Sequence, residues 1–195
     1  TVDKVVEVIS QNGQQEPVAA MKEALTEANS QLLEEAGADP SKSGMGTTVV
    51  AATVIGDLLH VANIGDSRLY VIDHEAIRQI TRDHSLVEDM VRMGMIDKEE
   101  AKTHYKKNVI TKAIGVADDR TATPDIFEIE ISDGEKLLLC SDGLTNMVED
   151  YEIKKIVTKN ERIEDAVRAL IDQANENGGK DNISAILIQP VLGKE

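Results

Sequence analysis

The stretch TTVVAATVIGDLLHVANIGDSRLYVI, residues Thr47–Ile72, decides the fold class. Residues 47–55 are β-branched and apolar on both faces, which predicts a strand inside a sandwich of sheets. Gly56-Asp57 predicts a tight hairpin turn, and Leu58 to Ile72 form the expected return strand. A glycine inside a strand often marks a bulge, so Gly65-Asp66-Ser67 is expected to interrupt that strand locally. The stretch therefore predicts an antiparallel hairpin.

Helices and shorter strands are expected on both sides of this hairpin. Apolar residues at helical spacing predict helices at about 2–9, 17–32, 150–158 and 163–175. Strands are predicted at about 76–81, 126–131, 136–140 and 183–188. Strand pairs flanked by long helices are typical of a layered α+β domain, and adjacent hairpins favour antiparallel sheets. The specific prediction is a four-layer α-β-β-α sandwich.

The segment from about His84 to Gly115 has a different character. It is polar, it carries several Met and Lys residues, and its pattern predicts two short helices. Asp97 and Glu100 have the spacing of an N-cap and its capping-box partner. We interpret this segment as a mobile excursion from the core.

Composition limits the classes of function. The chain has 195 residues and a formal charge of −15, which predicts one compact domain over residues 1–195. The negative charge argues against nucleic acid and anionic membrane surfaces as partners, because their phosphates would be repelled. No apolar run approaches the ~20 residues of a membrane span. Cys140 is the only cysteine, which fits a reducing cytoplasm.

The two ends of the chain lead to different expectations. The chain begins at Thr1 without an initiating Met, which suggests that a segment preceded it. The end, Pro190 to Glu195, is short and polar, and we expect it to be a natural C-terminus.

Three aspartates suggest the chemistry. Asp66, Asp142 and Asp181 each lie at the end of an apolar run, in Gly65-Asp66-Ser67, Ser141-Asp142-Gly143 and Lys180-Asp181-Asn182. Carboxylate oxygens are the ligands that Mg²⁺ and Mn²⁺ prefer. Carboxylates that cluster without cations repel one another, and a divalent ion offsets that repulsion. The three motifs together predict a metal-dependent hydrolase.

Each motif also has a structural interpretation. Asp142 could cap the turn or helix that follows it, and Asp181 could bond backbone N–H groups of its own loop. Asp66 is harder to explain in this way, because a charge inside an apolar strand is costly. Arg68 is close in sequence to Asp66 and could pair with it, but we interpret it as a surface or structural residue.

Other reactive residues are interpreted as structural. Cys140 has apolar neighbours and no following arginine that could cradle a phosphate, so an inert buried thiol is expected. The histidines show no zinc pattern. His60 is expected on a strand surface, and His84 could touch the site. The glycine-bearing segment Gly44–Thr48 lacks the lysine of a phosphate-binding loop and is interpreted as a turn.

The motifs also resemble a known family in their order and spacing. They are Gly46–Thr48, Ala62–Arg68, Asp83–Ser85, Asn108–Gly115, Leu137–Leu144 and Gly178–Asn182. This series is similar to that of the bacterial metal-dependent serine/threonine protein phosphatases, the PP2C-like or PPM family. The resemblance covers nearly all of the chain and is closest to the stand-alone phosphatases of Gram-positive bacteria that oppose serine/threonine kinases.

The resemblance implies a fold and a set of site residues. The fold is an α-β-β-α sandwich with a mobile flap at about residues 84–115, whose His84 and Ser85 would lie near the site. Asp142 and Asp181 would bind two catalytic Mn²⁺ or Mg²⁺ ions. Asp66, together with Asp142, would bind a third, more labile ion.

The resemblance also implies an activity. A metal-activated water would hydrolyse phosphoserine or phosphothreonine directly, with no covalent phosphoenzyme. The partners would be phosphorylated proteins, substrates of a serine/threonine kinase.

The chain departs from the family at its start. Members begin with strands that carry a phosphate-binding Arg and an Asp-Gly-Met-Gly-Gly segment, whose aspartate bridges both catalytic ions. Nothing in residues 1–44 matches this region, so the sequence predicts an incomplete metal site and missing N-terminal strands. The chain is then a fragment of an active enzyme, which the retained aspartates favour, or a shortened inactive relative that acts as a binding module. A phosphatase domain of a larger sensory protein is a third hypothesis.

Overall fold

The computed structural model describes residues 16–116 and 123–192, together with positions 3, 6, 7 and 10. The chain forms two compact units, each built from several stretches of sequence. The first contains Thr1–Thr53, His60–Asp66 and Asp83–Ile126; the second contains Val54–Leu59, Ser67–Arg82 and Phe127–Glu195. The helix expected at 2–9 lies mostly outside the described residues. The prediction of one domain over the whole chain stays a prediction.

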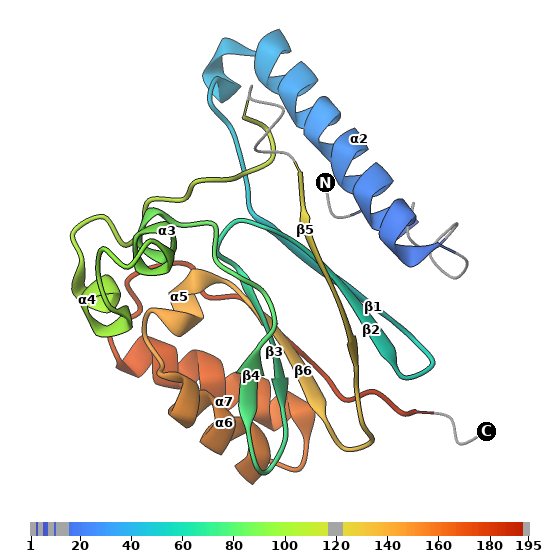
Figure 1. Ribbon diagram of the computed structural model, residues 1–195, viewed down its shortest axis with the longest axis vertical. Coiled ribbons are helices and arrows are strands. Elements are labelled where there is room, and N and C mark those ends of the chain that lie inside the picture. Colours follow the sequence, from blue (N-terminus) through green and yellow to red (C-terminus); the bar gives the residue numbers. More distant parts are fainter. Residues whose placement is uncertain (1–2, 4–5, 8–9, 11–15, 117–122, 193–195) are drawn as a thin grey trace. The chain divides into compact units, whose positions relative to one another are not determined.

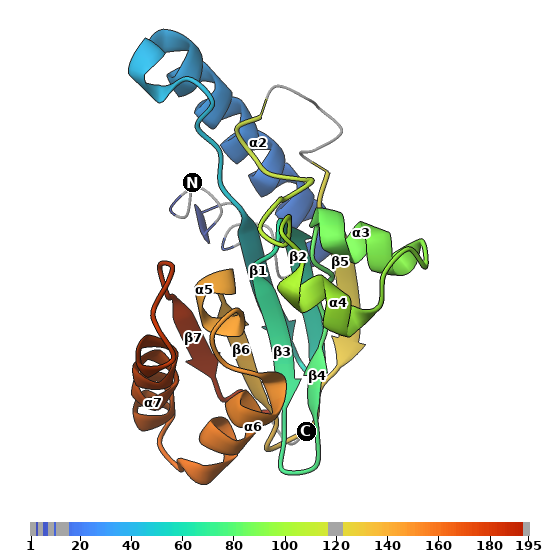
Figure 2. The same ribbon diagram turned by 90° about the vertical axis from the view of Figure 1, so that its left-hand side faces the viewer.

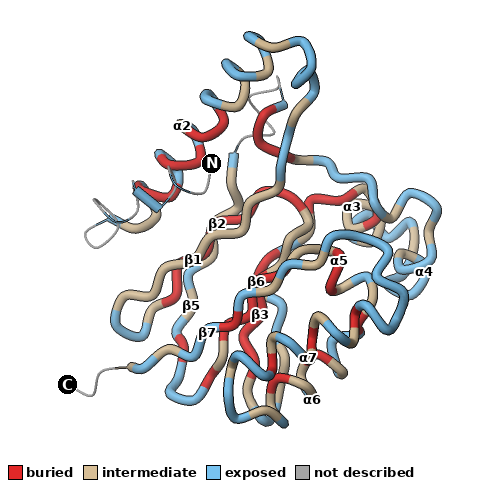
Figure 3. The backbone as a smooth tube through the Cα atoms, turned by 180° about the vertical axis from the view of Figure 1, so that it is seen from behind, coloured by how far each residue is buried: buried red, intermediate tan, exposed pale blue. Residues whose placement is uncertain are grey.

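The first unit is built on the long helix α2, Pro17–Ala38. Pro17 occupies its first turn, where the missing N–H costs no hydrogen bond. Met21, Leu25 and Ala28 are buried on one stripe, as the helical spacing predicts, and they pack against Ala62 and other apolar residues. Figure 3 shows this stripe in red along one side of the helix. A short 3₁₀ helix, Pro40–Lys42, follows α2.

A three-stranded sheet carries the hairpin predicted at the start of the fold (Figure 1). Its strands are β1 (Val49–Ile55), β2 (Leu58–Ile64) and β5 (Asp125–Glu130), in the order β1-β2-β5. Gly56-Asp57 forms the turn between β1 and β2, as predicted. The prediction that the first strand is covered on both faces is wrong. Among the described strands, β1 lies at the edge of its sheet and every one of its residues is partly exposed, whereas β2 lies in the middle and is mostly buried.

The prediction of one interrupted return strand is also wrong. β2 ends at Ile64, and the next strand, β3 (Arg68–Ile72), belongs to a different sheet. Gly65-Asp66-Ser67 is therefore the connection between two sheets and not a bulge within one strand. Gly65 has a φ of +109°, a backbone conformation that residues with a side chain rarely adopt. Periodicity could not reveal the change of sheet, because the residues are apolar on both sides of the motif.

The second unit contains a four-stranded antiparallel sheet (Figure 2). Its order is β4-β3-β6-β7, with β4 at Ile77–Gln79, β6 at Lys136–Cys140 and β7 at Ala185–Ile188. Asp133-Gly134 lies in the turn before β6. β7 is an edge strand among the described strands, and Ile186 is 60% exposed on it and Ile188 39%.

Two helices pack against this sheet, α6 (Asp150–Lys159) and α7 (Ile163–Glu176). Both lie within two residues of their predicted bounds. They bury Ile153 and Leu170 against Tyr70 of β3 and Leu138 of β6 in one apolar core. The short helix α5, Asp142–Thr145, follows β6 directly.

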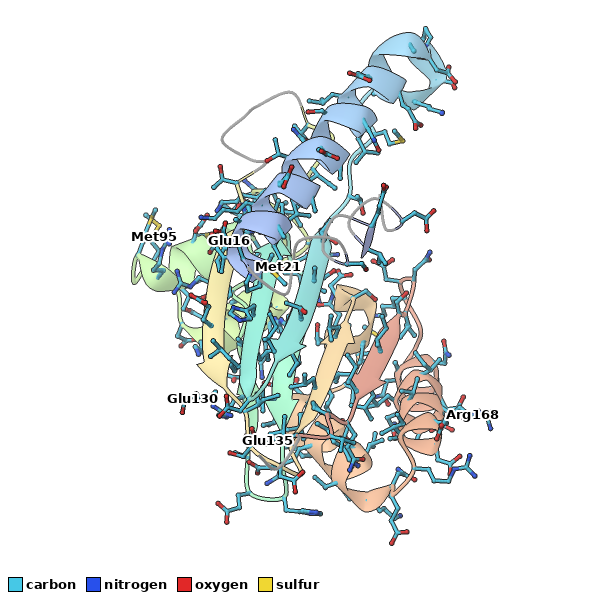
Figure 4. All side chains as sticks on the ribbon, turned by 90° about the vertical axis from the view of Figure 1, so that its right-hand side faces the viewer. Glu16, Met21, Met95, Glu130, Glu135 and Arg168 are labelled. Atoms are coloured by element: carbon cyan, nitrogen blue, oxygen red, sulfur yellow. The ribbon has the colours of Figure 1, made fainter. Side chains whose placement is uncertain are left out.

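Two short helices form the segment predicted as a flap, α3 (Leu86–Arg92) and α4 (Lys98–Thr103). Ser85 caps α3 by accepting the N–H of Glu88 at 3.2 Å. The capping box of Asp97 and Glu100 is confirmed at the start of α4. Met95, between the two helices, is 66% exposed and points away from them (Figure 4). The mobility of the segment stays a prediction.

The antiparallel sheets and their helices confirm the predicted α+β class. Among the described helices, none is both long enough and apolar enough to cross a bilayer.

Candidate metal centre

Asp142 lies where a buried strand meets a helix. The apolar run Lys136–Cys140 forms β6, Ser141 is the N-cap of α5, and Asp142 is the first residue of that helix. Asp142 is therefore not the cap that its structural interpretation suggested, although a carboxylate is stabilised in a first helical turn. Its side chain is partly buried, and its Oδ2 accepts a hydrogen bond from Nδ2 of Asn146 at 3.0 Å.

Asp181 reaches the same end of the sheet because β7 pairs with β6, with Ala185 opposite Cys140. Ser141 fixes the loop before β7 with its backbone and its hydroxyl. Its N–H donates to the carbonyl of Ser184, its Oγ donates to the carbonyl of Asn182, and its Oγ accepts the N–H of Ser184, each at 3.0 Å. The loop of Asp181 is thus bonded directly to the residue before Asp142.

Gly143 allows the two loops to approach this closely. A methyl group on Gly143 would overlap the carbonyl oxygen of Asn182 and would lie 3.5 Å from the carbonyl carbon of Asp181. The φ of Gly143 is not in the left-handed region, so the requirement for glycine is purely steric. Close contact between the two loops therefore explains why a glycine follows Asp142.

The two carboxylates interact electrostatically. Burial raises the pKa of Asp142, and the negative charge of Asp181 raises it further. The N–H of Gly143 and the positive charge of Arg68 act in the opposite direction without cancelling the rise. Asp181 is exposed, and its Oδ1 accepts the N–H of Asn182 at 2.7 Å, as expected for a loop aspartate. The pair is close enough to repel, and the surrounding dipoles and charges compensate only in part.

This arrangement fits a hard divalent cation. It offers carboxylate oxygens, which Mg²⁺ and Mn²⁺ prefer, and it carries a repulsion that a cation would offset. Among residues 16–116 and 123–192, no three or more His, Cys, Asp or Glu side chains group closely enough to hold an ion. Asp142 and Asp181 would therefore supply part of a coordination shell and not all of it.

Asp66 belongs to the first unit, and its place relative to Asp142 and Asp181 stays a prediction. Within that unit His84 holds the residue before Asp66. Nδ1 of His84 accepts the N–H of Gly65 at 2.9 Å, and the N–H of His84 donates to the carbonyl of Gly65 at 2.9 Å. His84 is buried, and it joins the start of the flap to the connection between the sheets. The sequence singled out His84 but gave no sign of this partner, which lies 19 residues away.

Thr48 also packs closely against Gly65. A side chain on Gly65 would overlap the side chain of Thr48. Thr47, next to it, exchanges two backbone hydrogen bonds of 3.0 Å with Ile114 at the end of the flap. The contacts of Thr47 and Thr48 agree with the structural role expected for Gly44–Thr48.

Two further expectations have clear outcomes. Cys140 is buried, as predicted. His60 is also buried, with 4% of its surface exposed, so its placement on a strand surface was wrong. The reason is that β2 is the central strand of its sheet and is covered on both faces.

Sequence reasoning missed a group of charges around His84. Asp125 Oδ1 accepts a hydrogen bond from Nζ of Lys112 at 3.1 Å. Asp125 Oδ2 lies 3.2 Å from Nε2 of His84, but the ring N–H is not aligned for a hydrogen bond. Burial acts to raise the pKa of Asp125, but its contacts with Lys112 and His84 outweigh that effect and lower it. The three residues are far apart in sequence, and no local motif marks them.

The stability of the first unit is expected to fall as the pH drops from 7 to 5.5. Burial lowers the pKa of His84; Lys112 adds to this, and Asp125 and Asp89 offset it only in part. The unfolded chain, with a histidine pKa near ~6.5, then binds more protons than the folded one, so unfolding is favoured as the pH falls through that value. The effect of one such group is at most about 1.4 kcal/mol per pH unit.

Urea denaturation between pH 7.5 and 5.5 measures this dependence. His84→Gln should flatten the slope of stability against pH, and His74→Gln, at an exposed position, serves as the control substitution. An equal slope in the wild type and in His84→Gln would contradict the role of His84.

Comparison with known proteins places this geometry in a family. A family model described as Protein phosphatase 2C matches residues 1–188. The serine/threonine phosphatase Stp of Listeria monocytogenes is 37% identical over 169 residues, which are 87% of this chain and 66% of that protein. The chain therefore spans 66% of the length of this curated relative.

Solved structures agree with the sequence matches. The serine/threonine phosphatase Stp1 from Staphylococcus aureus has a TM-score of 0.86 and 38% identity, covering 95% of this chain and 75% of its own. The catalytic domain of the serine/threonine protein phosphatase PstP was solved in complex with two manganese ions. It has a TM-score of 0.81 and 29% identity, and the match covers 95% of this chain and 78% of that one. The PP2C-like fold predicted from the motifs is thereby confirmed. The family model, the relatives and the fold agree over nearly all of the sequence, and the chain belongs to the protein phosphatase 2C family.

Proposed function

We propose that the protein containing this chain is a metal-dependent phosphatase that hydrolyses phosphoserine and phosphothreonine in other proteins. The observation that carries the proposal is the pair of carboxylates, Asp142 and Asp181, held together by Ser141 and Gly143. Relatives named as serine/threonine phosphatases support the class of substrate.

Asp142 and Asp181 would hold Mn²⁺ or Mg²⁺, and Asp66 would contribute to a third ion. When bound, such ions lower the pKa of water and offset the charge that develops on phosphoryl oxygens. The protein's own residues keep the ligands in place. Ser141 fixes the two loops of the second unit, and His84, on the proposed flap, fixes the backbone before Asp66 in the first unit.

The identity of the ion, the source of the substrates and the compartment complete the proposal. Mn²⁺ is the first choice because the related PstP was solved with manganese, and Mg²⁺ is the alternative. The substrates would be phosphorylated by a serine/threonine kinase, and the protein would work in the cytoplasm, which suits a chain with one buried thiol. A net charge of −15 disfavours nucleic acids and anionic membranes as partners.

Hydrolysis of a phosphothreonine peptide by the complete protein tests the proposal. We expect phosphate release that requires Mn²⁺ or Mg²⁺, stops on addition of a chelator and returns when the ion is restored. A phosphotyrosine peptide of the same sequence is the matched control and should be hydrolysed much more slowly. Phosphate release that chelation leaves unchanged would overturn the metal-dependent mechanism. A complete protein without Mn²⁺ binding or hydrolysis would favour the non-catalytic binding module.

A further inference from the structure

One residue forms hydrogen bonds with Asp142 at two points. Asn146, which follows α5, donates its backbone N–H to the carbonyl of Asp142 at 2.8 Å and its Nδ2 to Oδ2 of the same residue at 3.0 Å. Because α5 has only four residues, these bonds join its first residue to the residue after its last. Among the described residues, Asn146 supplies the only side-chain hydrogen bond to either carboxylate of the proposed metal centre.

The backbone around Asn146 is fixed by the core of the second unit. The N–H groups of Met147 and Val148 both donate to the carbonyl of Leu144, at 3.0 and 2.9 Å. Val148 is buried in the apolar core. The carbonyl of Met147 accepts Nδ2 of Asn177, the C-cap of α7, at 2.7 Å. The side chain of Asn146 is exposed, but the backbone that carries it is held on the core.

The bond to Oδ2 restricts the carboxylate of Asp142 without using up its binding capacity. An ionised carboxylate has about four lone-pair positions on its two oxygens, so it can accept an amide N–H and still bind an ion. The amide is uncharged, so it does not repel a divalent ion as a cationic side chain would. The bond therefore limits the rotation of the carboxylate and leaves its negative charge in place.

The two carboxylates are held in different ways. Oδ1 of Asp181 accepts the backbone N–H of the next residue, Asn182, and every residue type except proline could supply that group. Oδ2 of Asp142 is held instead by a side chain, which a substitution can remove while the backbone stays the same. Position 146 therefore allows the orientation of one carboxylate to be changed alone.

We propose that Asn146 is a positioning residue of the metal centre: its amide holds the carboxylate of Asp142 in the orientation that binds a divalent ion. This inference rests on the proposed metal site. Removal of a group that orients a metal ligand typically lowers ion affinity by roughly ten- to a hundredfold. The alternative is an ordinary hydrogen bond on a helix surface, which stabilises the helix slightly and does not affect an ion.

The two interpretations differ in what water can replace. Because the bond is exposed, a water molecule can donate to Oδ2 once the amide is removed, so the ion-free protein loses little stability. A water molecule does not restrict the rotation of the carboxylate, so an ion must then order its own ligand when it binds. Loss of the amide should therefore lower ion affinity and leave the stability of the ion-free fold nearly unchanged.

Calorimetric titration of Mn²⁺ into the complete protein measures this effect. Asn146→Ala keeps the backbone bond to Asp142 and removes only the amide, so its affinity for Mn²⁺ should be about tenfold lower than that of the wild type. The melting temperature of the ion-free variant should stay within about 2 °C of the wild type, because water replaces the lost bond. Asn146→Gln keeps an amide that can reach an aspartate four residues earlier, so its affinity should return to within about threefold of the wild type.

Asn177→Ala is the matched control. It also replaces an exposed asparagine of the second unit by alanine, and it removes the hydrogen bond of 2.7 Å to Met147, next to Asn146. Both bonds between Asn146 and Asp142 remain. The affinity of this variant for Mn²⁺ should therefore stay within about twofold of the wild type, because Asn177 orients no ligand of the ion.

Unchanged affinity in Asn146→Ala, or equally weak binding in Asn146→Gln, would show that the amide does not position Asp142. An equal loss of affinity in Asn177→Ala would assign the effect to the fold of the turn and overturn the inference in the same way. These results leave the proposed metal site intact, since the wild type still binds Mn²⁺. No Mn²⁺ binding by the wild-type complete protein would overturn the proposed metal site and the inference with it.

Discussion

Asp142→Asn is expected to lower phosphatase activity of the complete protein by roughly a thousandfold or more, the scale of losing several kcal/mol of charge stabilisation from a metal ion. Asparagine has nearly the same shape but no negative charge, so a divalent ion loses a main ligand while the fold is preserved. The substitution also removes the repulsion between Asp142 and Asp181. The ion-free variant should therefore be at least as stable as the wild type, and only its activity and Mn²⁺ affinity should fall.

Asp172→Asn is the control for this experiment. Asp172 is an exposed residue of α7 in the same unit, and the change of charge is identical. Its phosphate release and Mn²⁺ affinity should match those of the wild type. Wild-type activity in Asp142→Asn, measured at several Mn²⁺ concentrations, would remove Asp142 from the metal site.

Gly143→Ala is expected to cost about 1–3 kcal/mol of stability and to remove most of the activity. The added methyl would overlap the carbonyl oxygen of Asn182, which also accepts the hydroxyl of Ser141. The loop of Asp181 must then move away from Asp142, and the hydrogen bonds of Ser141 that join the two loops must lengthen or break. Chemical denaturation followed by circular dichroism measures the loss of stability, and Mn²⁺ titration measures the loss of the site.

Gly37→Ala supplies the comparison. A methyl group on Gly37 would meet no atom within 4 Å, its φ is not in the left-handed region, and it lies near the end of α2. Alanine favours a helix over glycine by up to about 1 kcal/mol, so this variant should be as stable as the wild type or slightly more stable. Equal stability of Gly143→Ala and Gly37→Ala would contradict the contact described between the two loops.

Local sequence patterns predicted the helices well where the buried residues form one stripe or where a clear capping motif marks the start of the helix. α6 and α7 were placed within two residues, because their apolar residues recur at helical spacing. The capping box of Asp97 and Glu100 is a purely local device and was read correctly. Such features depend on residues three or four positions apart, which a sequence displays directly.

The sequence did not reveal which distant strands pair with one another. The run from Leu58 to Ile72 is mostly apolar on both sides of Gly65-Asp66-Ser67, and nothing in it shows that the strands before and after this motif belong to different sheets. The error over His60 has the same origin, because its burial depends on which strands lie on either side of β2.

The candidate site was predicted in its parts but not in its assembly. Strand ends and adjacent glycines identified Asp142 and Asp181, but their meeting depends on the pairing of β6 with β7 and on the three hydrogen bonds of Ser141. The hydrogen bonds between His84 and Gly65 and between Tyr70 and Asp150 have no local signature, because each joins residues that tertiary packing brings together.

β7 lies at the edge of its sheet among the described strands, and this position has a consequence for how the chain behaves in solution. Unpaired backbone groups beside exposed apolar side chains, here Ile186 and Ile188, are a template on which another strand can add. A net charge of −15 makes separate copies repel one another, which opposes this addition. Concentrated salt or mild acid weakens that repulsion, so precipitation is to be expected under those conditions before any loss of the fold.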